Sequence, residues 1–579
     1  SEGSPGKQTE RLRDEDGMVQ GDSRYKKSGA EIEAGVDEQS EEFRAWDDQF
    51  GDQVMYGDGA DEEKKRRIKR LVFAFRDMIS DNPKAPAAID GVEHIVTMIK
   101  DWDGKPRRMR LRPHSPKEFE AVRQAADTLL EGGIVRPSTS PWACGVVLVP
   151  KKGTDELRVC CDFRFLNAVT EGDGMLIPRI DDVLDKLRDA TEMSAMDMHA
   201  GYWATNLREE DRHKTAFMTW SHGLLEWVRM PMGLKNSGAT YQRMLQHILG
   251  PLLWESSMNY LDDVAIYSKG DSDHIDDLAR VMKRLVRWGV SVKLTKCVFS
   301  CHTMPFLGFM VRTGAGISVD PKKIKALLES MPDKLTTVTS VKSLLGATSY
   351  YRKYIPDYAA ISEPLLRLIK GRRKRDNIED RWAEDERMCD ASVRALKAAL
   401  ISTPVLAFPD YKRPMIIAAD ASKTSIGAVL LQIGDDGIER PLAYASRKLS
   451  SAEMNYGISE RECLSVVWAT RLWRKHLTTD SIIITDHSAL TSLRDKPDLH
   501  GRLLRFALEL SELDLTIMHR PGIDEKHAIC DMLSRFDVQE KTASELTEEM
   551  GRLLEDRFEV LMRETPPDQR VGAELLEEL

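Results

Sequence analysis

The chain has 579 residues, of which 41% are hydrophobic and 31% charged, and its net charge is −10 at pH 7. This length suits several domains of about 100–200 residues each. The eight cysteines are sparse, which favours free thiols in a reducing compartment over a disulfide-rich secreted scaffold. No run approaches the ~18 apolar residues of a membrane-spanning helix and no signal peptide opens the sequence, so we expect a soluble protein that is not secreted.

Acidic residues concentrate at the two ends of the chain. Residues 1–62 carry a net charge of −11 and residues 536–579 one of −8, which leaves +9 on residues 63–535. A basic body with acidic tails suits the binding of a polyanion, although ordinary surface charge accounts for +9 over this length equally well. Because residues 1–62 have few apolar anchors, we expect them to be largely disordered.

A basic run from Lys64 to Arg70 follows this acidic segment and leads into the apolar residues Leu71 to Phe75. The pattern favours a helix, and two interpretations of its basic residues remain open. They either contact a phosphate backbone or form the solvated face of the helix.

Apolar periodicity and turn residues predict the elements further along the chain. Ser115 and Pro116 are typical of a helix start, as the N-cap and the first helical residue. Predicted helices cover residues 115–132, 239–249, 275–288, 321–330, 339–350 and 460–472. Predicted strands cover residues 144–150, 157–163, 415–419, 427–431 and 482–485, and another strand ends near Asp197.

Two adjacent carboxylates stand between short apolar runs in Tyr260-Leu261-Asp262-Asp263. Neighbouring side chains on a flat strand point to opposite faces, so these acids converge only at the turn of a hairpin. Clustered carboxylates bind Mg²⁺, and pairs of Mg²⁺ ions drive phosphoryl transfer. The alternative is a solvated turn that carries two acids and has no catalytic role.

Short blocks stand in order on both sides of this pair. They include Gly133-Ile134-Val135-Arg136-Pro137-Ser138, Arg158-Val159-Cys160-Cys161-Asp162-Phe163-Arg164, Lys214-Thr215-Ala216-Phe217, Met230-Pro231-Met232-Gly233-Leu234, Phe306-Leu307-Gly308 and Tyr350-Tyr351-Arg352. In this order, over about residues 90 to 536, the blocks resemble the reverse transcriptase–ribonuclease H region of gypsy-type long-terminal-repeat retrotransposons.

The resemblance implies a multidomain chain of α+β and α/β folds, in which a right-hand polymerase of fingers, palm and thumb precedes a ribonuclease H-like α/β domain. The expected parts are an acidic, largely disordered segment (1–62), an N-terminal extension (63–112), fingers and palm (113–316), thumb and short linker (317–404), a ribonuclease H domain (405–536) and an acidic helical tail (537–579).

For the polymerase, the resemblance makes Asp197, Asp262 and Asp263 the catalytic acids, which would hold two Mg²⁺ ions with Mn²⁺ as a substitute. It makes Tyr202 the steric gate against a 2′-hydroxyl, so that the substrate is a deoxynucleoside triphosphate. Arg158 and one of two lysines, Lys151 or Lys152, would grip the triphosphate.

Other blocks imply contacts with the base and with the primer. Met232 and Gly233 match the loop beneath the incoming base, and the family usually has Phe in place of Met232 and Gln in place of Ala204. These two departures bear on nucleotide selectivity and touch no metal ligand. The implied primer grip is Phe306, Leu307 and Gly308.

A second active site is implied in the C-terminal part of the chain. Its metal-binding acids match Asp420, Glu462, Asp486 and Asp531. They would hold two further Mg²⁺ ions, because four clustered acids repel one another without a cation. Ser459 and Glu462 also fit a helix capping box, which is a structural alternative for Glu462. His519 and His527 are candidates for a histidine that assists product release.

We therefore expect an RNA- and DNA-directed DNA polymerase with ribonuclease H activity. Its partners would be an RNA template, a DNA primer, the RNA–DNA hybrid and deoxynucleoside triphosphates, without a membrane, and the protein would be a monomer or a homodimer. We expect a cytoplasmic location within virus-like particles, with the nucleus as an alternative. A decayed or domesticated copy that only binds nucleic acid is the alternative function.

Overall fold

The computed structural model contains two compact units, Ser1–Leu307 and Gly308–Leu579. Each mixes helices with sheets, as the sequence predicts. No described helix is long and apolar enough to cross a membrane. The structure describes residues 23–79, 88–89, 91–110, 113–150, 157–199, 201–330, 335–355, 358–373, 376–384, 386–401, 406–435, 437–491, 501–513 and 515–520.

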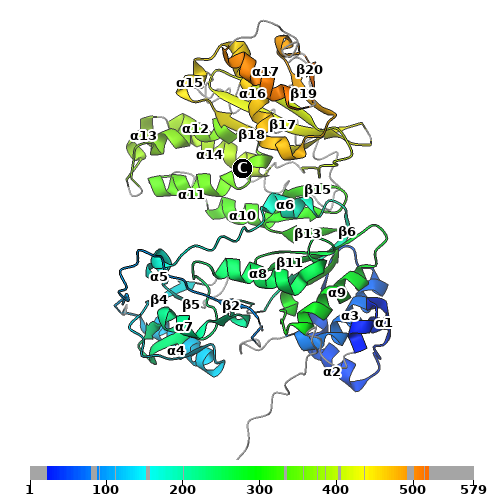
Figure 1. Ribbon diagram of the computed structural model, residues 1–579, viewed down its shortest axis with the longest axis vertical. Coiled ribbons are helices and arrows are strands. Elements are labelled where there is room, and N and C mark those ends of the chain that lie inside the picture. Colours follow the sequence, from blue (N-terminus) through cyan, green and yellow to red (C-terminus); the bar gives the residue numbers. More distant parts are fainter. Residues whose placement is uncertain are drawn as a thin grey trace, which may run out of the picture. The chain divides into compact units, whose positions relative to one another are not determined.

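A five-stranded sheet forms the centre of the first unit, with the strand order β1-β12-β6-β11-β10. Strand β6 lies in the middle, antiparallel to β11 and β12. Helix α8 contacts β10 and helix α9 contacts β11 (Figure 1), and both helices confirm predicted elements. The elements are β1 (Met55–Tyr56), β6 (Ala190–Asp197), β10 (Ser257–Tyr260), β11 (Asp263–Lys269), β12 (Val298–Cys301), α8 (Ser237–Leu249) and α9 (His274–Arg287).

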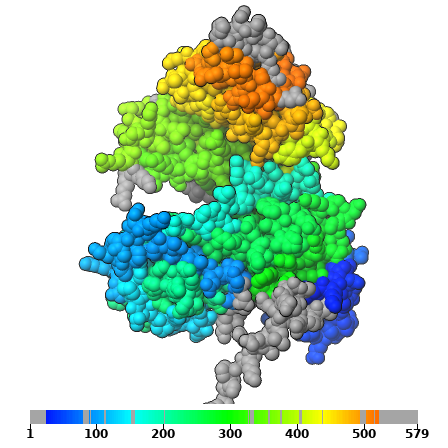
Figure 2. Space-filling view, in the orientation of Figure 1, coloured from blue at the N-terminus to red at the C-terminus, as the bar shows by residue number. Residues whose placement is uncertain are grey.

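The N-terminal segment differs from its predicted disorder. Residues 23–62 are ordered, and their helices share a hydrophobic core with α8, α9 and strands of the five-stranded sheet (Figures 1 and 2). Phe43 and Trp46 are buried, and their rings lie 5.0 and 5.5 Å from the ring of Phe73. A few well-placed aromatic residues therefore anchor a segment whose composition alone favours disorder. Its helices are α1 (Gly29–Ala34), α2 (Glu41–Phe50) and α3 (Glu62–Ala74).

The basic run lies on α3, where acids of the same chain pair with it. Arg67 contacts Glu33 and Asp273, each at 2.9 Å. Further pairs join Arg66 to Glu38, Lys69 to Asp47, Arg70 to Glu33 and Lys64 to Glu192. Arg66 is 66% exposed while it is paired, so the run forms a solvated helix face whose charges are largely balanced by acids of the same chain. Contact of this face with a phosphate backbone stays a prediction.

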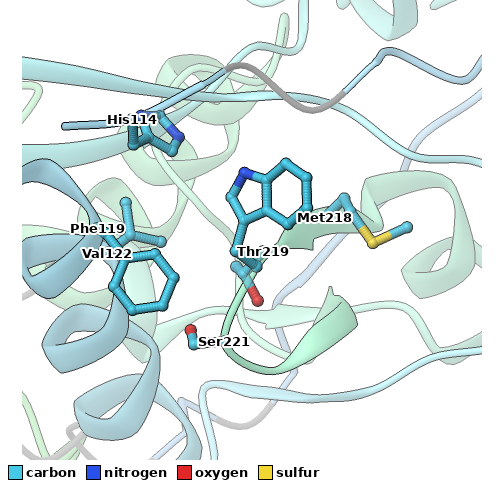
Figure 3. Close-up of a pocket in the computed structure, with 7 residues that line it drawn as sticks. His114, Phe119, Val122, Met218, Thr219 and Ser221 are labelled. Carbon is cyan, nitrogen blue, oxygen red and sulfur yellow. The ribbon is translucent and has the colours of Figure 1, made fainter. Parts of the chain in front are cut away.

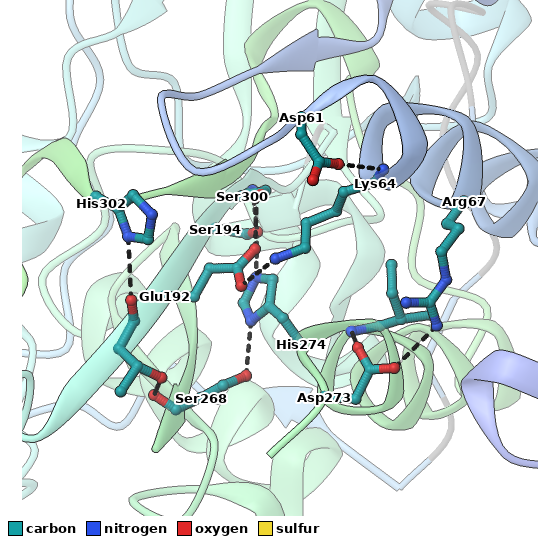
Figure 4. Close-up of polar contacts among 12 residues, drawn as sticks. Asp61, Lys64, Arg67, Glu192, Ser194, Ser268, Asp273, His274, Ser300 and His302 are labelled. Atoms are coloured by element: carbon teal, nitrogen blue, oxygen red, sulfur yellow. Dashed lines mark hydrogen bonds and ion pairs between the residues drawn. The ribbon is translucent and has the colours of Figure 1, made fainter. Parts of the chain in front are cut away.

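A buried chain of hydrogen bonds continues from Lys64 into the palm sheet (Figure 4). Lys64 Nζ lies 2.8 Å from Glu192 Oε2, and Ser300 Oγ donates to Glu192 Oε1. Ser194 Oγ accepts from Ser300 N at 2.9 Å and lies 2.7 Å from His274 Nε2. Burial lowers the pKa of His274. The hydrogen bonds of this network connect α3, the strands β6 and β12, and α9.

Smaller elements complete the first unit. Helix α4 has Ser115 as its N-cap and Pro116 at its first position, which confirms the predicted start. The elements are α4 (Pro116–Glu131), α5 (Arg164–Val169), α6 (Ile180–Asp185), α7 (Glu209–Arg212), β2 (Glu93–His94), β3 (Val135–Pro137), β4 (Val146–Pro150), β5 (Leu157–Cys161), β7 (Asn206–Leu207), β8 (Phe217–Thr219), β9 (Gly223–Trp227) and β13 (Thr303–Phe306).

The second unit begins with a hairpin and helices and continues into a mixed five-stranded sheet, ordered β18-β17-β16-β19-β20. Its first elements are β14 (Phe309–Arg312), β15 (Gly316–Val319), α10 (Pro321–Ser330), α11 (Val338–Ser349), α12 (Tyr358–Ile369), α13 (Glu379–Glu384) and α14 (Glu386–Ile401). The later ones are β16 (Ile416–Ala421), β17 (Ser425–Ile433), β18 (Glu439–Lys448), α15 (Ser451–Met454), α16 (Ile458–Trp473), β19 (Ser481–Thr485), α17 (Gly501–Ser511) and β20 (Leu515–His519).

Candidate active sites

The first group of acids lies where β6 meets the hairpin of β10 and β11. Asp263 is the register partner of Asp197 on β6 and of Tyr260 on β10. Leu261 and Asp262 therefore form a two-residue turn, and the predicted hairpin is present. The turn places Asp262 and Asp263 at one end of the palm sheet beside Asp197.

The turn holds its backbone in an unusual conformation. Leu261 has φ of 55°, a left-handed conformation that costs a residue with a side chain about 1–2 kcal/mol. Gln242 on α8 is fully buried, and its Oε1 accepts the Leu261 N–H at 2.8 Å. Sequence reasoning missed Gln242, because no local pattern distinguishes it from other helical glutamines.

A lysine supplies positive charge beside the first group of acids. Lys296 Nζ lies 3.0 Å from Asp197 Oδ2. Within the described residues, Asp197, Asp262 and Asp263 do not bring a ligand atom from each to within 4.8 Å of the others. The three acids of the first group are thus neighbours in the fold, with Lys296 as the counter-ion of Asp197. Sequence reasoning missed this lysine as well.

The predicted steric gate, Tyr202, stacks on a second tyrosine from α8. The rings of Tyr202 and Tyr241 lie 4.8 Å apart and 11° from parallel. Burial, and then the charge of Asp262, raise the pKa of Tyr202. Gly201 leaves room for this stack, because a Cβ there would lie 2.1 Å from the Tyr241 hydroxyl oxygen. The fold therefore fixes the Tyr202 ring near the turn that carries the acids.

The other predicted nucleotide contacts that the structure describes are exposed. Arg158 is on β5, opposite Val149 of β4, while Lys151 and Lys152 lie outside the described residues. Met232 is 58% exposed, and Gly233 has φ of 93°, which favours glycine.

Asn167 fixes the loop that contains Met232 and Gly233. Its side chain donates to Gly233 O at 2.9 Å and accepts from Lys235 N at 2.8 Å. The Asn167 carboxamide therefore ties the loop after β9 to α5, and Lys235 adds a hydrogen bond to the Thr170 carbonyl oxygen.

The predicted primer grip is a tight bend in the backbone. Phe306 is buried at the end of β13, and Leu307 and Gly308 have φ of 53° and 85°. A Cβ on Gly308 would lie 3.8 Å from ring atoms of Tyr350 and from the Tyr351 hydroxyl. The bend thus depends on glycine at position 308, because glycine adopts a positive φ without strain.

The second group of acids gathers at one end of the C-terminal sheet. Asp420 lies on β16, and Asp486 directly follows β19, which runs parallel to β16 with Ala418 opposite Ile484. Glu462 reaches the same point from α16. Ligand atoms of the three acids lie within 4.8 Å of one another. The structure therefore brings three of the four predicted acids together.

Glu462 is the most perturbed acid of this group. Burial, and then the charges of Asp420 and Asp486, raise its pKa to about 9. Its Oε2 is buried and has no hydrogen-bond partner within the described part of the chain. A hard divalent cation would satisfy this oxygen and the neighbouring carboxylates, so the donor set fits Mg²⁺ or Mn²⁺.

The capping-box alternative for Glu462 is wrong. Helix α16 begins at Ile458, and the N–H of its N-cap, Gly457, donates to the Glu460 carboxylate at 2.9 Å. Ser459 Oγ instead lies 2.9 Å from His487 Nε2. Glu462 therefore has no role at the helix terminus.

Two further predicted residues, Asp531 and His527, lie outside the described residues. His519 ends β20, and its Nε2 lies 3.1 Å from the backbone oxygen of Asp486. Of the two candidate histidines, His519 is thus placed beside an acid of the second group.

A small hollow on the first unit lies between α4 and the turn that joins β8 to β9 (Figure 3). Its lining residues are His114, Phe119, Val122, Met218, Thr219, Trp220 and Ser221. None of these residues is a predicted site residue. The two groups of acids therefore remain the candidate active sites.

Two domain families match the chain. One, described as reverse transcriptase (RNA-dependent DNA polymerase), matches residues 149–311. The other, described as an RNase H-like domain found in reverse transcriptase, matches residues 410–513. The first range contains Asp197, Asp262 and Asp263, and the second contains the three acids of the C-terminal sheet.

Curated relatives include retrovirus-related Pol polyproteins of Drosophila melanogaster transposons. The protein from transposon 297 is 32% identical over 85% of this chain and 45% of its own length. The protein from opus is 36% identical over 72% and 42%, and that from gypsy 33% over 76% and 43%. The chain thus spans less than half the length of these relatives.

Solved structures share the fold. The foamy viral protease-reverse transcriptase dRH in complex with double-stranded DNA aligns with a TM-score of 0.69 at 20% identity, over 82% of this chain and 81% of that one. The same viral enzyme in complex with an RNA/DNA hybrid aligns with a TM-score of 0.66 at 20% identity, over 86% and 65%. The polymerase and ribonuclease H-like fold class is therefore confirmed.

Proposed function

This chain belongs to the reverse transcriptase–ribonuclease H family of gypsy-type long-terminal-repeat retrotransposons, and we propose that it copies RNA and DNA templates into DNA and degrades the RNA of the hybrid. The observation that carries the proposal is the pairing of Asp197 with Asp263 across β6 and β11 beside the Tyr202 ring. The second group of acids, Asp420, Glu462 and Asp486, would catalyse the cleavage of RNA.

In the polymerase reaction, Asp197, Asp262 and Asp263 are the carboxylates that would hold two Mg²⁺ ions. Bound Mg²⁺ supplies activation of the primer hydroxyl and neutralisation of the triphosphate. Lys296 Nζ lies 3.0 Å from Asp197 Oδ2 and would balance the charge of this acid when no cation is bound. Tyr202, fixed by Tyr241, excludes a 2′-hydroxyl by volume and so selects deoxynucleotides.

Around the nucleotide, exposed side chains would contact the phosphates and the base. The Arg158 guanidinium, with Lys151 or Lys152, offers donors to the triphosphate oxygens. Met232 and Gly233 lie under the incoming base, and the bend at Phe306, Leu307 and Gly308 holds the primer end.

In the ribonuclease reaction, Asp420, Glu462, Asp486 and Asp531 would hold the cations that activate water and stabilise the departing oxygen. Burial and the neighbouring acids raise the pKa of Glu462 to about 9, so this carboxyl would release a proton to water on binding a cation. His519 Nε2, beside the Asp486 backbone oxygen, is placed to carry a proton during product release.

The proposed partners are an RNA template, a DNA primer, the RNA–DNA hybrid and deoxynucleoside triphosphates, acting in a monomer or homodimer. The proposed location is the cytoplasm within virus-like particles, with the nucleus as the alternative. Intact acids at the polymerase and ribonuclease positions support an active enzyme over a copy that only binds nucleic acid.

The test is extension of a DNA primer on a 5′-labelled RNA template with Mg²⁺ and deoxynucleotides, which reports synthesis and RNA cleavage together. Asp263→Asn should abolish extension and spare cleavage, whereas Asp420→Asn should abolish cleavage and spare extension. A parent protein that binds the hybrid but neither extends nor cleaves would establish the binding-only alternative.

A further inference from the structure

We propose that Gln242 is a positioning residue for polymerisation, because its buried carboxamide holds the turn that carries Asp262 and Asp263. This inference rests on the proposed polymerase function and assigns the role to a residue outside the acidic motif. Gln242 touches no substrate, and it acts through the backbone of the turn.

The turn needs external support because of its own conformation. Leu261 stands between Tyr260 and Asp263 with φ of 55°, in a region that residues with side chains rarely adopt. Such a conformation persists only where the surrounding structure over-determines it. A turn relaxed at Leu261 would change the direction of the carboxylates on Asp262 and Asp263.

Gln242 supplies this support at two points on the β10 side of the turn. Its Oε1 accepts the Leu261 N–H at 2.8 Å, and its Nε2 donates to the Asn259 carbonyl oxygen at 3.4 Å. The side chain is fully buried, so water does not compete for these groups. Because Leu261 N–H is a donor, the amide oxygen must face it, which fixes the orientation of the carboxamide.

The same helix also supports the nucleotide gate. Tyr241, the residue before Gln242, stacks under Tyr202. Helix α8 thus provides a rigid base for the gate ring and for the acidic turn. Gln242 links the catalytic acids to this base.

The test compares Gln242→Met, which keeps the length of the side chain and removes both hydrogen bonds, with Gln246→Met, one turn further along α8. We expect Gln242→Met to lower the polymerisation kcat with Mg²⁺ roughly 10- to 100-fold, because small displacements of reacting groups cost rates of this size. Since Mg²⁺ demands nearly ideal octahedral geometry, Mn²⁺ should restore more of the lost rate, and the Mg²⁺/Mn²⁺ rate ratio should fall.

Two further readouts separate positioning from loss of folded protein. Ribonuclease H cleavage by the same Gln242→Met molecule should equal that of the parent, and electron paramagnetic resonance should show weaker Mn²⁺ binding at one class of sites. Gln242→Glu keeps an acceptor oxygen for the Leu261 N–H, and it should retain a higher Mg²⁺/Mn²⁺ ratio than Gln242→Met. This second variant decides the question if the methionine variant misfolds.

The outcomes distinguish this inference from the function on which it rests. A parent protein that fails to extend the primer overturns the polymerase proposal. A parent that extends, with an unchanged kcat and Mg²⁺/Mn²⁺ ratio in Gln242→Met, overturns the role of Gln242. The role of Gln242 is also overturned if Gln242→Met and Gln246→Met change kcat and the Mg²⁺/Mn²⁺ ratio equally. The same conclusion follows if Gln242→Met and Gln242→Glu have equal effects.

Discussion

Glu462 combines deep burial with two acidic neighbours, and in the metal-free protein its pKa rises to about 9. The ordinary value is 4.5, so between pH 4.5 and about 9 the folded state holds a proton that the unfolded state has lost. Stability of the metal-free protein should therefore fall as pH rises through this window, and a bound cation should remove the dependence.

We predict that Glu462→Gln abolishes RNA cleavage and flattens this pH dependence. In EDTA, the melting temperature of the C-terminal unit in the parent should fall by on the order of 5 °C between pH 6 and pH 8.5. The glutamine variant should change less, because its amide does not titrate. Calorimetry at several pH values checks this, and parallel curves for the two proteins would contradict it.

Lys296 makes a partly exposed ion pair with Asp197, in which the two side chains are 57% and 26% exposed. Exposed pairs contribute up to about 1 kcal/mol, so competition with a cation is worth at most about fivefold in affinity. We predict that Lys296→Met tightens Mn²⁺ binding at the polymerase site by up to this factor. Lys296→Arg keeps the charge and should match the parent in a binding titration.

A weaker affinity in Lys296→Met would show that the lysine assists cation binding instead. The same titration on Asp420→Asn protein limits the signal to the polymerase acids, because that variant lacks a ligand of the other site.

The acids could be predicted from short motifs, whereas their supporting residues could not. Asp262 and Asp263 carry their own signal, because two adjacent carboxylates between apolar runs need a turn. Gln242 and Lys296 are ordinary residue types whose contacts arise only when distant segments meet. Tertiary contacts of this kind leave no local pattern.

At the scale of elements, the helices of residues 23–79 belong to the first compact unit, Ser1–Leu307. Trp46 is 7% exposed, and its ring lies against Phe73 of α3. We predict that Trp46→Ala lowers the free energy of unfolding of this unit by about 3–5 kcal/mol, as expected for a buried tryptophan. Urea denaturation, with the remaining primer-extension activity as the probe of folded protein, measures the change in this free energy.

Trp220→Ala is the matched control, because Trp220 is 57% exposed. Its effect should stay within about 1 kcal/mol. If Trp46→Ala unfolds at the same urea concentration as the parent, the N-terminal helices do not contribute to the stability of the palm.

Most other elements could be predicted because their ends carry local signals. Ser115 and Pro116 start α4, and the apolar periodicity of α9 gives its length within one residue at each end. The prediction of disorder was wrong for residues 23–62, because their order comes from buried aromatic anchors such as Trp46 and from ion pairs such as Glu33 with Arg67. The composition of this segment shows its many acidic residues. It does not show that basic residues of α3 pair with them in the folded chain.

At the scale of the whole molecule, contacts in the second unit cross the boundary that we predicted after residue 404. Ile317 pairs with Leu406, and the Ala359 N–H donates to Ser446 Oγ at 3.0 Å. Helix α12 and strand β18 should therefore open together. The boundary itself stays a prediction.

We predict that Ser446→Ala weakens the protection of α12 amides as well as those of β18, by about 1 kcal/mol for the lost hydrogen bond. Hydrogen exchange of the full chain, read by mass spectrometry, checks both segments in one experiment. Ser451→Ala, on the short helix after β18, is the control. Faster exchange confined to β18 would show that the helices and the sheet open independently.

The pairing of Met55 with Val298 has a consequence for synthesis. During synthesis β1 emerges before its partner strand β12, which follows only after the more than 200 residues between them have been translated. Until then the helices of residues 29–74 cannot complete the core that they share with α8 and α9, and exposed apolar surface of this kind is prone to aggregation. A ribosome that stalls before residue 298 would release a chain that cannot close its palm sheet.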